Sequence, residues 1–216
     1  MTTGTSDLAV ALYNVRQAYR LIYHFQNRAN DTIKSIQDQF GGLEFFHWMP
    51  TYTNLSPSKR RNPIDIRPDN FFSLYDFSLL YQMPRIDKFS NNDEPINSDI
   101  LEINLEIDAN ASRALVEGGL DTFELEMNTP ASPETTQSTL SLYLWTREKN
   151  PGSSRDWVND VWSVTPWPDS ETNQPEQNEA GWSIGCKFPL TKLSGLEKIK
   201  AATDDAQRVF KAMPRS

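Results

Sequence analysis

The feature that most constrains the fold is a strict alternation of apolar and polar side chains in residues 101–108. The odd positions there are aliphatic, and the even positions hold carboxylate or amide side chains. A β-strand sends successive side chains to opposite faces, so this pattern predicts a strand with one buried face and one polar face. The alternation returns in residues 123–127. We therefore expect strands that present a row of carboxylates to water: Glu102, Glu106, Asp108, Asp121, Glu124 and Glu126.

Acidic charge is concentrated around these predicted strands. Residues 99–134 hold nine carboxylates against a single arginine, and the whole chain of 216 residues has a net charge of −8. An acidic face of this kind binds cations, binds a basic protein partner, or only keeps the protein in solution, and the pattern does not separate the three. Because an acidic chain repels phosphate backbones, general nucleic-acid binding is not expected.

A long amphipathic helix is predicted at residues 6–40. Apolar residues recur there in alternating steps of four and three, with one polar break at Gln26, and this is the heptad spacing of a helix-packing seam. At 1.5 Å per residue the helix would be about 50 Å long, so we expect it to bend near residues 27–31 or to project from the body. The seam then either packs on the rest of the protein or forms a homodimer contact, whose residues would be Leu8, Leu12, Val15, Tyr19 and Ile22.

The remaining pattern predicts about six or seven strands followed by a second helix. The strands are expected at residues 43–49, 71–81, 100–108, 120–128, 139–146, 157–164 and 182–188, and the helix at 193–213. Segment 71–81 is apolar on both faces, which predicts a central strand, whereas 165–180 has the composition of a mobile acidic loop.

Consecutive strands without helical crossovers favour an antiparallel sheet. We therefore expect a single α+β domain over residues 1–216: an antiparallel sheet of about six or seven strands flanked by a long N-terminal helix and a C-terminal helix, both on one face.

Residue types that carry much enzyme chemistry are scarce in this chain. One cysteine, Cys186, and two histidines, His24 and His47, are too few for a zinc site of the Cys/His kind. Neither a Gly-rich phosphate loop nor a Gly-x-Ser-x-Gly elbow occurs. We expect a buried, unreactive thiol at Cys186, a solvated His24 and a core or edge position for His47. One cysteine, with no apolar run of about 20 residues, favours a soluble cytoplasmic protein without membrane association.

Three functions remain open, and we favour a non-enzymatic interaction or regulatory protein. It would form a homo-oligomer through the long N-terminal helix and present its acidic sheet face to a basic protein partner. A metal-dependent phosphodiesterase or nuclease would instead use the strand carboxylates to hold a divalent cation, although the nearest downstream basic residues, Arg147 and Lys149, lie at the end of another predicted strand. A small-ligand sensor with an aromatic pocket is the third. No resident cofactor is predicted, and no catalytic residue is identified.

Overall fold

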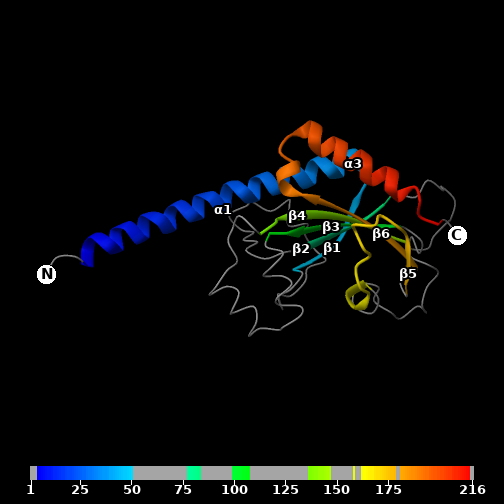
Figure 1. Ribbon diagram of the computed structural model, residues 1–216, viewed down its shortest axis with the longest axis horizontal. Helices are drawn as coiled ribbons and strands as arrows, with labels where there is room; N and C mark the ends of the chain where they lie inside the picture. The colour runs from blue at the N-terminus through cyan, green and yellow to red at the C-terminus, as the bar shows by residue number, and fades with distance from the viewer. Residues whose placement is uncertain are drawn as a thin grey trace.

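Six described strands form one antiparallel sheet, and two helices lie across one of its faces in this computed structural model (Figure 1). The structure describes residues 4–50, 77–83, 99–107, 136–146, 158, 162–178 and 181–214. Its elements are α1 (Gly4–Phe40), β1 (Glu44–Pro50), β2 (Phe77–Gln82), β3 (Ile100–Glu106), β4 (Thr139–Trp145), η3 (Trp162–Val164), β5 (Glu176–Asn178), β6 (Gly181–Pro189), η4 (Leu190–Lys192) and α3 (Leu196–Phe210). The predicted α+β arrangement, with an N-terminal and a C-terminal helix on an antiparallel sheet, is confirmed.

The strands follow the order β1-β2-β3-β4-β6-β5, and every neighbouring pair is antiparallel. Strand β3 lies in the interior of the sheet and places Glu102 opposite Leu80 on β2 and Tyr143 on β4. Five of the six residues of β2 are buried, so both of its faces are covered. This agrees with the apolar pattern that predicted a central strand in 71–81, of which residues 77–81 are described.

Two predictions about the segment between β4 and β6 are wrong. In the described part of 157–164, Val158 is helical and residues 162–164 form the 3-10 helix η3 instead of a strand. The predicted loop 165–180 contains β5, a short edge strand that pairs with β6 after a turn at Asn173, where φ is 52°. Trp162 of η3 is buried against the sheet, so this segment packs on the sheet face and does not extend the ladder. The strand predicted at 120–128 lies outside the described residues.

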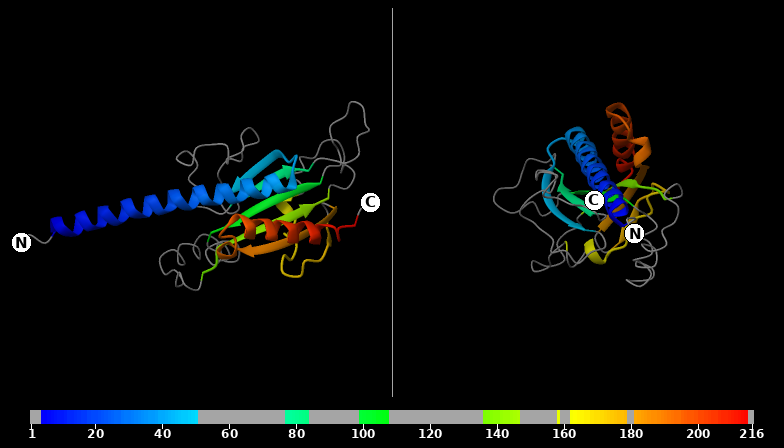
Figure 2. Two further views of the ribbon diagram at one scale, coloured as in Figure 1. Left: turned by 90° about the horizontal axis from the view of Figure 1, so that it is seen from above. Right: turned by 90° about the vertical axis from the view of Figure 1, so that its left-hand side faces the viewer.

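The aliphatic core lies between the sheet and the two helices. The odd-numbered residues of β3 face it, together with Ile33 and Ile36 of α1 and Phe210 of α3. The helices also contact each other: the rings of Phe40 and Phe210 are 6.2 Å apart, and Gln207 Nε2 donates a hydrogen bond to the carbonyl oxygen of Gln39. Both helices therefore cover the same face of the sheet (Figure 2).

Helix α1 is unbroken over its 37 residues, and its N-terminal half projects from the body (Figures 1 and 2). It ends at Gly41 and Gly42, whose φ values of 66° and 63° suit glycine in the left-handed region. Of the two geometries expected for so long a helix, the structure therefore has the projecting one. No described helix, α1 included, combines the length and the apolar character that a membrane span requires.

Candidate functional site

The face of the sheet turned away from the helices is lined by polar and aromatic side chains. It receives the even-numbered residues of β3 and, from the adjoining strands, Ser78, Thr139, Tyr143 and Trp145. A second cluster covers part of this face, in which Val158 and Trp162 pack against Leu80, Ile100, Tyr143 and Trp145. The polar side of β3 is therefore mostly interior, although alternation alone predicted a face in water.

Glu102 is fully buried in this face, with 0% of its surface exposed, and its carboxylate accepts four hydrogen bonds. Oε1 accepts from the Ser78 hydroxyl at 2.7 Å and from Trp167 Nε1 at 2.9 Å. Oε2 accepts from Trp145 Nε1 at 2.8 Å and from Trp162 Nε1 at 2.9 Å. A carboxylate offers about four lone-pair directions, so its accepting capacity is filled. We refer to Glu102, Ser78, Trp145, Trp162 and Trp167 as the Glu102 cage.

The cage joins segments that are distant in the chain. Ser78 and Trp145 stand on the strands either side of β3, whereas Trp162 belongs to η3 and Trp167 follows it. Asn104 Nδ2 donates to the Ser78 hydroxyl oxygen at 2.9 Å, which leaves the hydroxyl proton to point at Glu102. The cage therefore fastens the segment after η3 to the middle of the sheet.

Two opposing effects act on the charge of Glu102. Burial raises the pKa of this carboxyl above its ordinary value of 4.5, while the hydrogen bonds from Ser78 and the three indoles lower it. Burial is the larger effect, so the net direction is upward. Perturbed carboxyls in proteins are often functional, but this one has no lone pair left for a substrate or a metal ion.

Tyr143 extends the cage toward the surface. Its ring stacks on that of Trp167, with centroids 6.5 Å apart and planes inclined by 18°. Gly185 is paired with Tyr143 across β4 and β6, and a Cβ atom at this glycine would lie 2.6 Å from Tyr143 Cδ1. The absence of a side chain at residue 185 thus allows the Tyr143 ring to lie over β6. Burial raises the pKa of Tyr143 to about 12.

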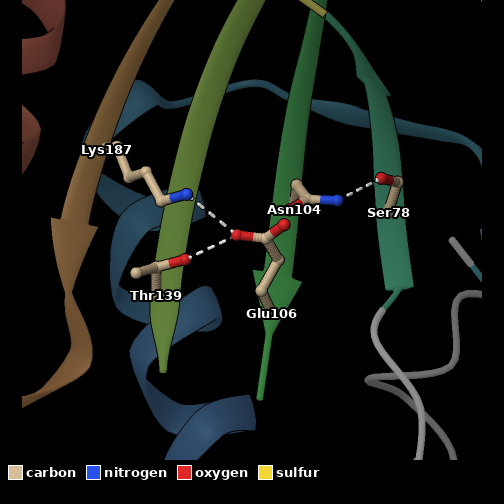
Figure 3. A network of polar contacts seen from close by, with 5 residues as sticks. All are labelled: Ser78, Asn104, Glu106, Thr139 and Lys187. Atoms are coloured by element: carbon tan, nitrogen blue, oxygen red, sulfur yellow. Dashed lines mark hydrogen bonds and ion pairs between the residues drawn. The ribbon is translucent and has the colours of Figure 1, made fainter. Parts of the chain in front are cut away.

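A second carboxylate on the same side of β3 is also paired. Glu106 Oε2 accepts a hydrogen bond from Thr139 at 2.8 Å and forms an ion pair with Lys187 Nζ at 3.0 Å (Figure 3). The side chains of Glu106 and Lys187 are 17% and 33% exposed, so the pair lies near the edge of the covered region. Figure 3 also shows Asn104 and Ser78 beside this pair, in a row of polar contacts that crosses β2, β3, β4 and β6.

The prediction of a water-facing carboxylate row is therefore wrong at Glu102, and Glu106 is partly buried in an ion pair. The physical reason is that indole and hydroxyl donors replace water around Glu102, which alternation within one strand cannot reveal. Asp108, Asp121, Glu124 and Glu126 lie outside the described residues. Among those described, no three His, Cys, Asp or Glu side chains gather as metal ligands would.

The cysteine and the two histidines belong to no group of three or more potential metal ligands among the described residues. Cys186 faces the aliphatic core, and burial raises the pKa of its thiol to about 12, so it stays protonated near neutral pH. His24 is exposed on α1, where its ring meets Tyr23 edge-on at 5.8 Å. His47 is 2% exposed on β1. These positions agree with the roles expected from the sequence.

The predicted helix-interface residues lie on the projecting half of α1. Four of them are about half exposed or more: Leu8 (60%), Leu12 (47%), Val15 (50%) and Tyr19 (58%). Ile22 is partly buried. Val10, Tyr13, Leu21 and Tyr23 of the same half are also exposed. The two candidate regions therefore differ in kind. The Glu102 cage is polar and mostly buried, whereas the N-terminal half of α1 is apolar and exposed.

The cage tryptophans were missed as carboxylate partners. The structure uses the indole N–H edges of Trp145, Trp162 and Trp167 as donors to Glu102. A usable signal does exist: the predicted strands 71–81 and 139–146 are largely apolar, and a carboxylate placed between such strands needs hydrogen-bond donors from elsewhere.

Comparison with known proteins assigns the chain to a family. A family model described as PM0109 matches residues 5–213. No curated protein and no solved structure matches the chain.

Proposed function

The chain belongs to the PM0109 family, and we propose that it is a non-enzymatic interaction protein that assembles as a homodimer through α1. The contact is the exposed seam, defined as Leu8, Leu12, Val15, Tyr19 and Ile22. The observation that carries the proposal is the exposure of large apolar side chains along a helix that projects from the body (Figure 1). Apolar surface of this extent on a monomer marks an interaction site.

Continuity along α1 supports a packing role for the seam. The spacing of four and three that begins at Leu8 continues into Ala29, Ile33 and Ile36, which pack against the core. One helix face therefore serves the interior at its C-terminal end and meets solvent at its N-terminal end. A helix without tertiary contacts is only marginally stable in water, so a partner along the N-terminal half would stabilise it as well as cover it.

A second copy of the chain fits this surface because the seam repeats. Two helices with the same heptad spacing insert their side chains into each other's gaps, and a two-fold dimer brings the same patch from both copies. Val10 and Leu21 are exposed outside the seam. Both lie on the side of the helix opposite the seam, so this dimer contact leaves them in water.

Sedimentation velocity of the full chain tests the proposal, with Leu12→Glu as the disrupting change. The substitution occurs twice in a symmetric dimer, and about 1.4 kcal/mol per copy corresponds to an affinity loss of about 100-fold. Gln17→Glu is the matched control, since it adds the same charge on the opposite side of the helix from Leu12 and Val15. A wild-type chain that stays monomeric at submillimolar concentration contradicts the proposal, and so does equal weakening by both variants.

The other functions receive less support from the described residues. A basic partner would have to be recognised by Asp108, Asp121, Glu124 and Glu126, because Glu102 is buried and Glu106 pairs with Lys187. A metal ion at Glu102 would have to displace hydrogen bonds from the cage. A cytoplasmic location remains part of the proposal and rests on a single, buried cysteine.

A further inference from the structure

A groove opens where α1 leaves the body. One wall is formed by α1, and the other by the residues before β4 and the segment that follows β6, which passes beside α1 (Figure 1). Its lining residues are Phe25, Arg28, Ala29, Thr32, Thr136, Gln137, Ser138, Pro189, Leu190, Thr191, Lys192, Leu193 and Ser194. Its volume is about 920 Å³, which is within the range of small-molecule sites in proteins.

The groove is positively charged in an acidic protein. Arg28 on the α1 wall and Lys192 on the opposite wall are cations, and none of the described lining residues is Asp or Glu. The chain as a whole has a net charge of −8. In the described part of the chain, neither Arg28 nor Lys192 takes part in a salt bridge. Two cations without a carboxylate partner, on facing walls, favour an anionic group between them.

Much of the rest of the lining is apolar, and two of its hydroxyl groups are already hydrogen-bonded. Phe25, Ala29 and Leu190 supply apolar surface. The hydroxyl of Thr32 donates to the carbonyl oxygen of Arg28 at 2.9 Å, and that of Ser138 donates to the carbonyl oxygen of Ile107. These two hydroxyl protons are thus committed within the protein. The cations are left to hold the head of a ligand, and the apolar surface to hold its body.

We propose that this groove binds a small organic acid. Its carboxylate lies between Arg28 and Lys192, and its hydrocarbon body lies against Phe25 and Leu190. The site is separate from the exposed seam, because none of the seam residues lines the groove. It joins the base of the projecting helix to the body, so an occupied groove braces α1 at its point of exit.

Isothermal titration of the full chain with octanoate tests this site. Octanoate should bind, while octylamine and octanol, which have the same tail without the anionic head, should bind at least about tenfold more weakly. Acetate, which has the head without the tail, should also bind at least about tenfold more weakly. Equal affinity for octanoate and octanol overturns the proposal, as does the absence of any octanoate heat up to about 10 mM, a concentration at which even weak complexes form.

Charge-removing variants locate the binding. Arg28→Gln and Lys192→Gln should each weaken octanoate binding about fivefold to tenfold, and both together more strongly. Lys200→Gln is the matched control, because Lys200 is an exposed lysine of α3 outside the groove lining. Octanoate affinity that is unchanged in the double variant places the ligand elsewhere and overturns the assignment. Leu12→Glu should leave octanoate binding intact, so failure of the dimer and failure of this site are distinguishable.

Discussion

On the helix-covered side of β3, Leu101, Ile103 and Leu105 pack among other aliphatic side chains, whereas on the opposite side Glu102 and Asn104 are held by hydrogen bonds. Both sides are buried, but by different interactions. The stability of an aliphatic core depends mainly on the volume of its side chains and little on their orientation. The stability of a buried carboxylate depends on the orientation of each hydrogen-bond donor. The comparison shows that both faces of one sheet can be buried in different ways. One face is held by the fit of aliphatic side chains, and the other by hydrogen bonds to specific donors.

The strongest way to break this comparison is Glu102→Gln. The amide keeps the shape of the side chain but replaces an accepting oxygen with a donor, so two of the four cage donors lose their acceptor. We expect a loss of about 3 kcal/mol in the free energy of unfolding. Ile103→Val, one residue away on the aliphatic side, should cost only about 1 kcal/mol. Urea unfolding followed by circular dichroism measures both, and equal losses would remove the distinction between the two sides.

Gly185→Ala tests how closely the cage side is packed. The new methyl group would meet the Tyr143 ring, and we expect a loss of about 2 kcal/mol from overpacking. Gly195→Ala is the control, because no atom lies within 4 Å of a Cβ placed there and its φ of −167° is ordinary extended backbone. The control should lose less than about 1 kcal/mol. A harmless Gly185→Ala would show that Tyr143 moves aside freely.

The tryptophan donors can be ranked by burial. Trp162→Phe removes a buried indole N–H from Glu102 and should cost about 2 kcal/mol, whereas Trp167→Phe, at a residue 37% exposed, should cost about 1 kcal/mol because water can replace the donor. Thermal unfolding of the two variants under one buffer condition gives the order. The reverse order would mean that Trp167 is the main anchor of the segment after η3.

The smallest expected effect is on stability at alkaline pH, where one titratable group lies on each side of the sheet. The pKa of Cys186 rises from 9.0 to about 12 on folding, and that of Tyr143 rises from 10.0 to about 12. A raised folded-state pKa stabilises the protein fully below the unfolded value and less as pH rises above it. Wild type should therefore lose about 1 kcal/mol relative to Cys186→Ala between pH 8 and pH 10. Tyr143→Phe should alter the curve only above pH 10, and a flat difference for Cys186→Ala would contradict its burial.

Local periodicity was enough to predict much of the fold. Alternation located β3 and assigned Leu101, Ile103 and Leu105 to one side, and the spacing of four and three placed α1 within a few residues of its observed bounds. These features follow from neighbours in the chain. The burial of Glu102 does not, because its donors Trp145 and Trp162 lie 43 and 60 residues away. The sequence of residues 101–108 does not indicate that these two tryptophans contact Glu102.

The two halves of α1 show a second limit. One heptad pattern runs through both, yet Ile33 and Ile36 are buried in the core while Leu8 and Leu12 are exposed. A repeat specifies that a face is suited to packing and says nothing about what packs on it. Sequence could therefore predict the seam but not divide it between the protein's own sheet and another surface.

The Glu102 cage has a consequence for sequence conservation among relatives of this chain. Losing one indole leaves a buried carboxylate short of a donor, and losing the carboxylate leaves three indole N–H groups without an acceptor, so each single step away is unfavourable. Relatives of this chain should accordingly keep Glu102, Trp145, Trp162 and Trp167 as a set or replace the set with apolar residues. An alignment in which the four positions vary independently would contradict this expectation. It would mean that variants lacking one member of the cage are more stable than this geometry implies.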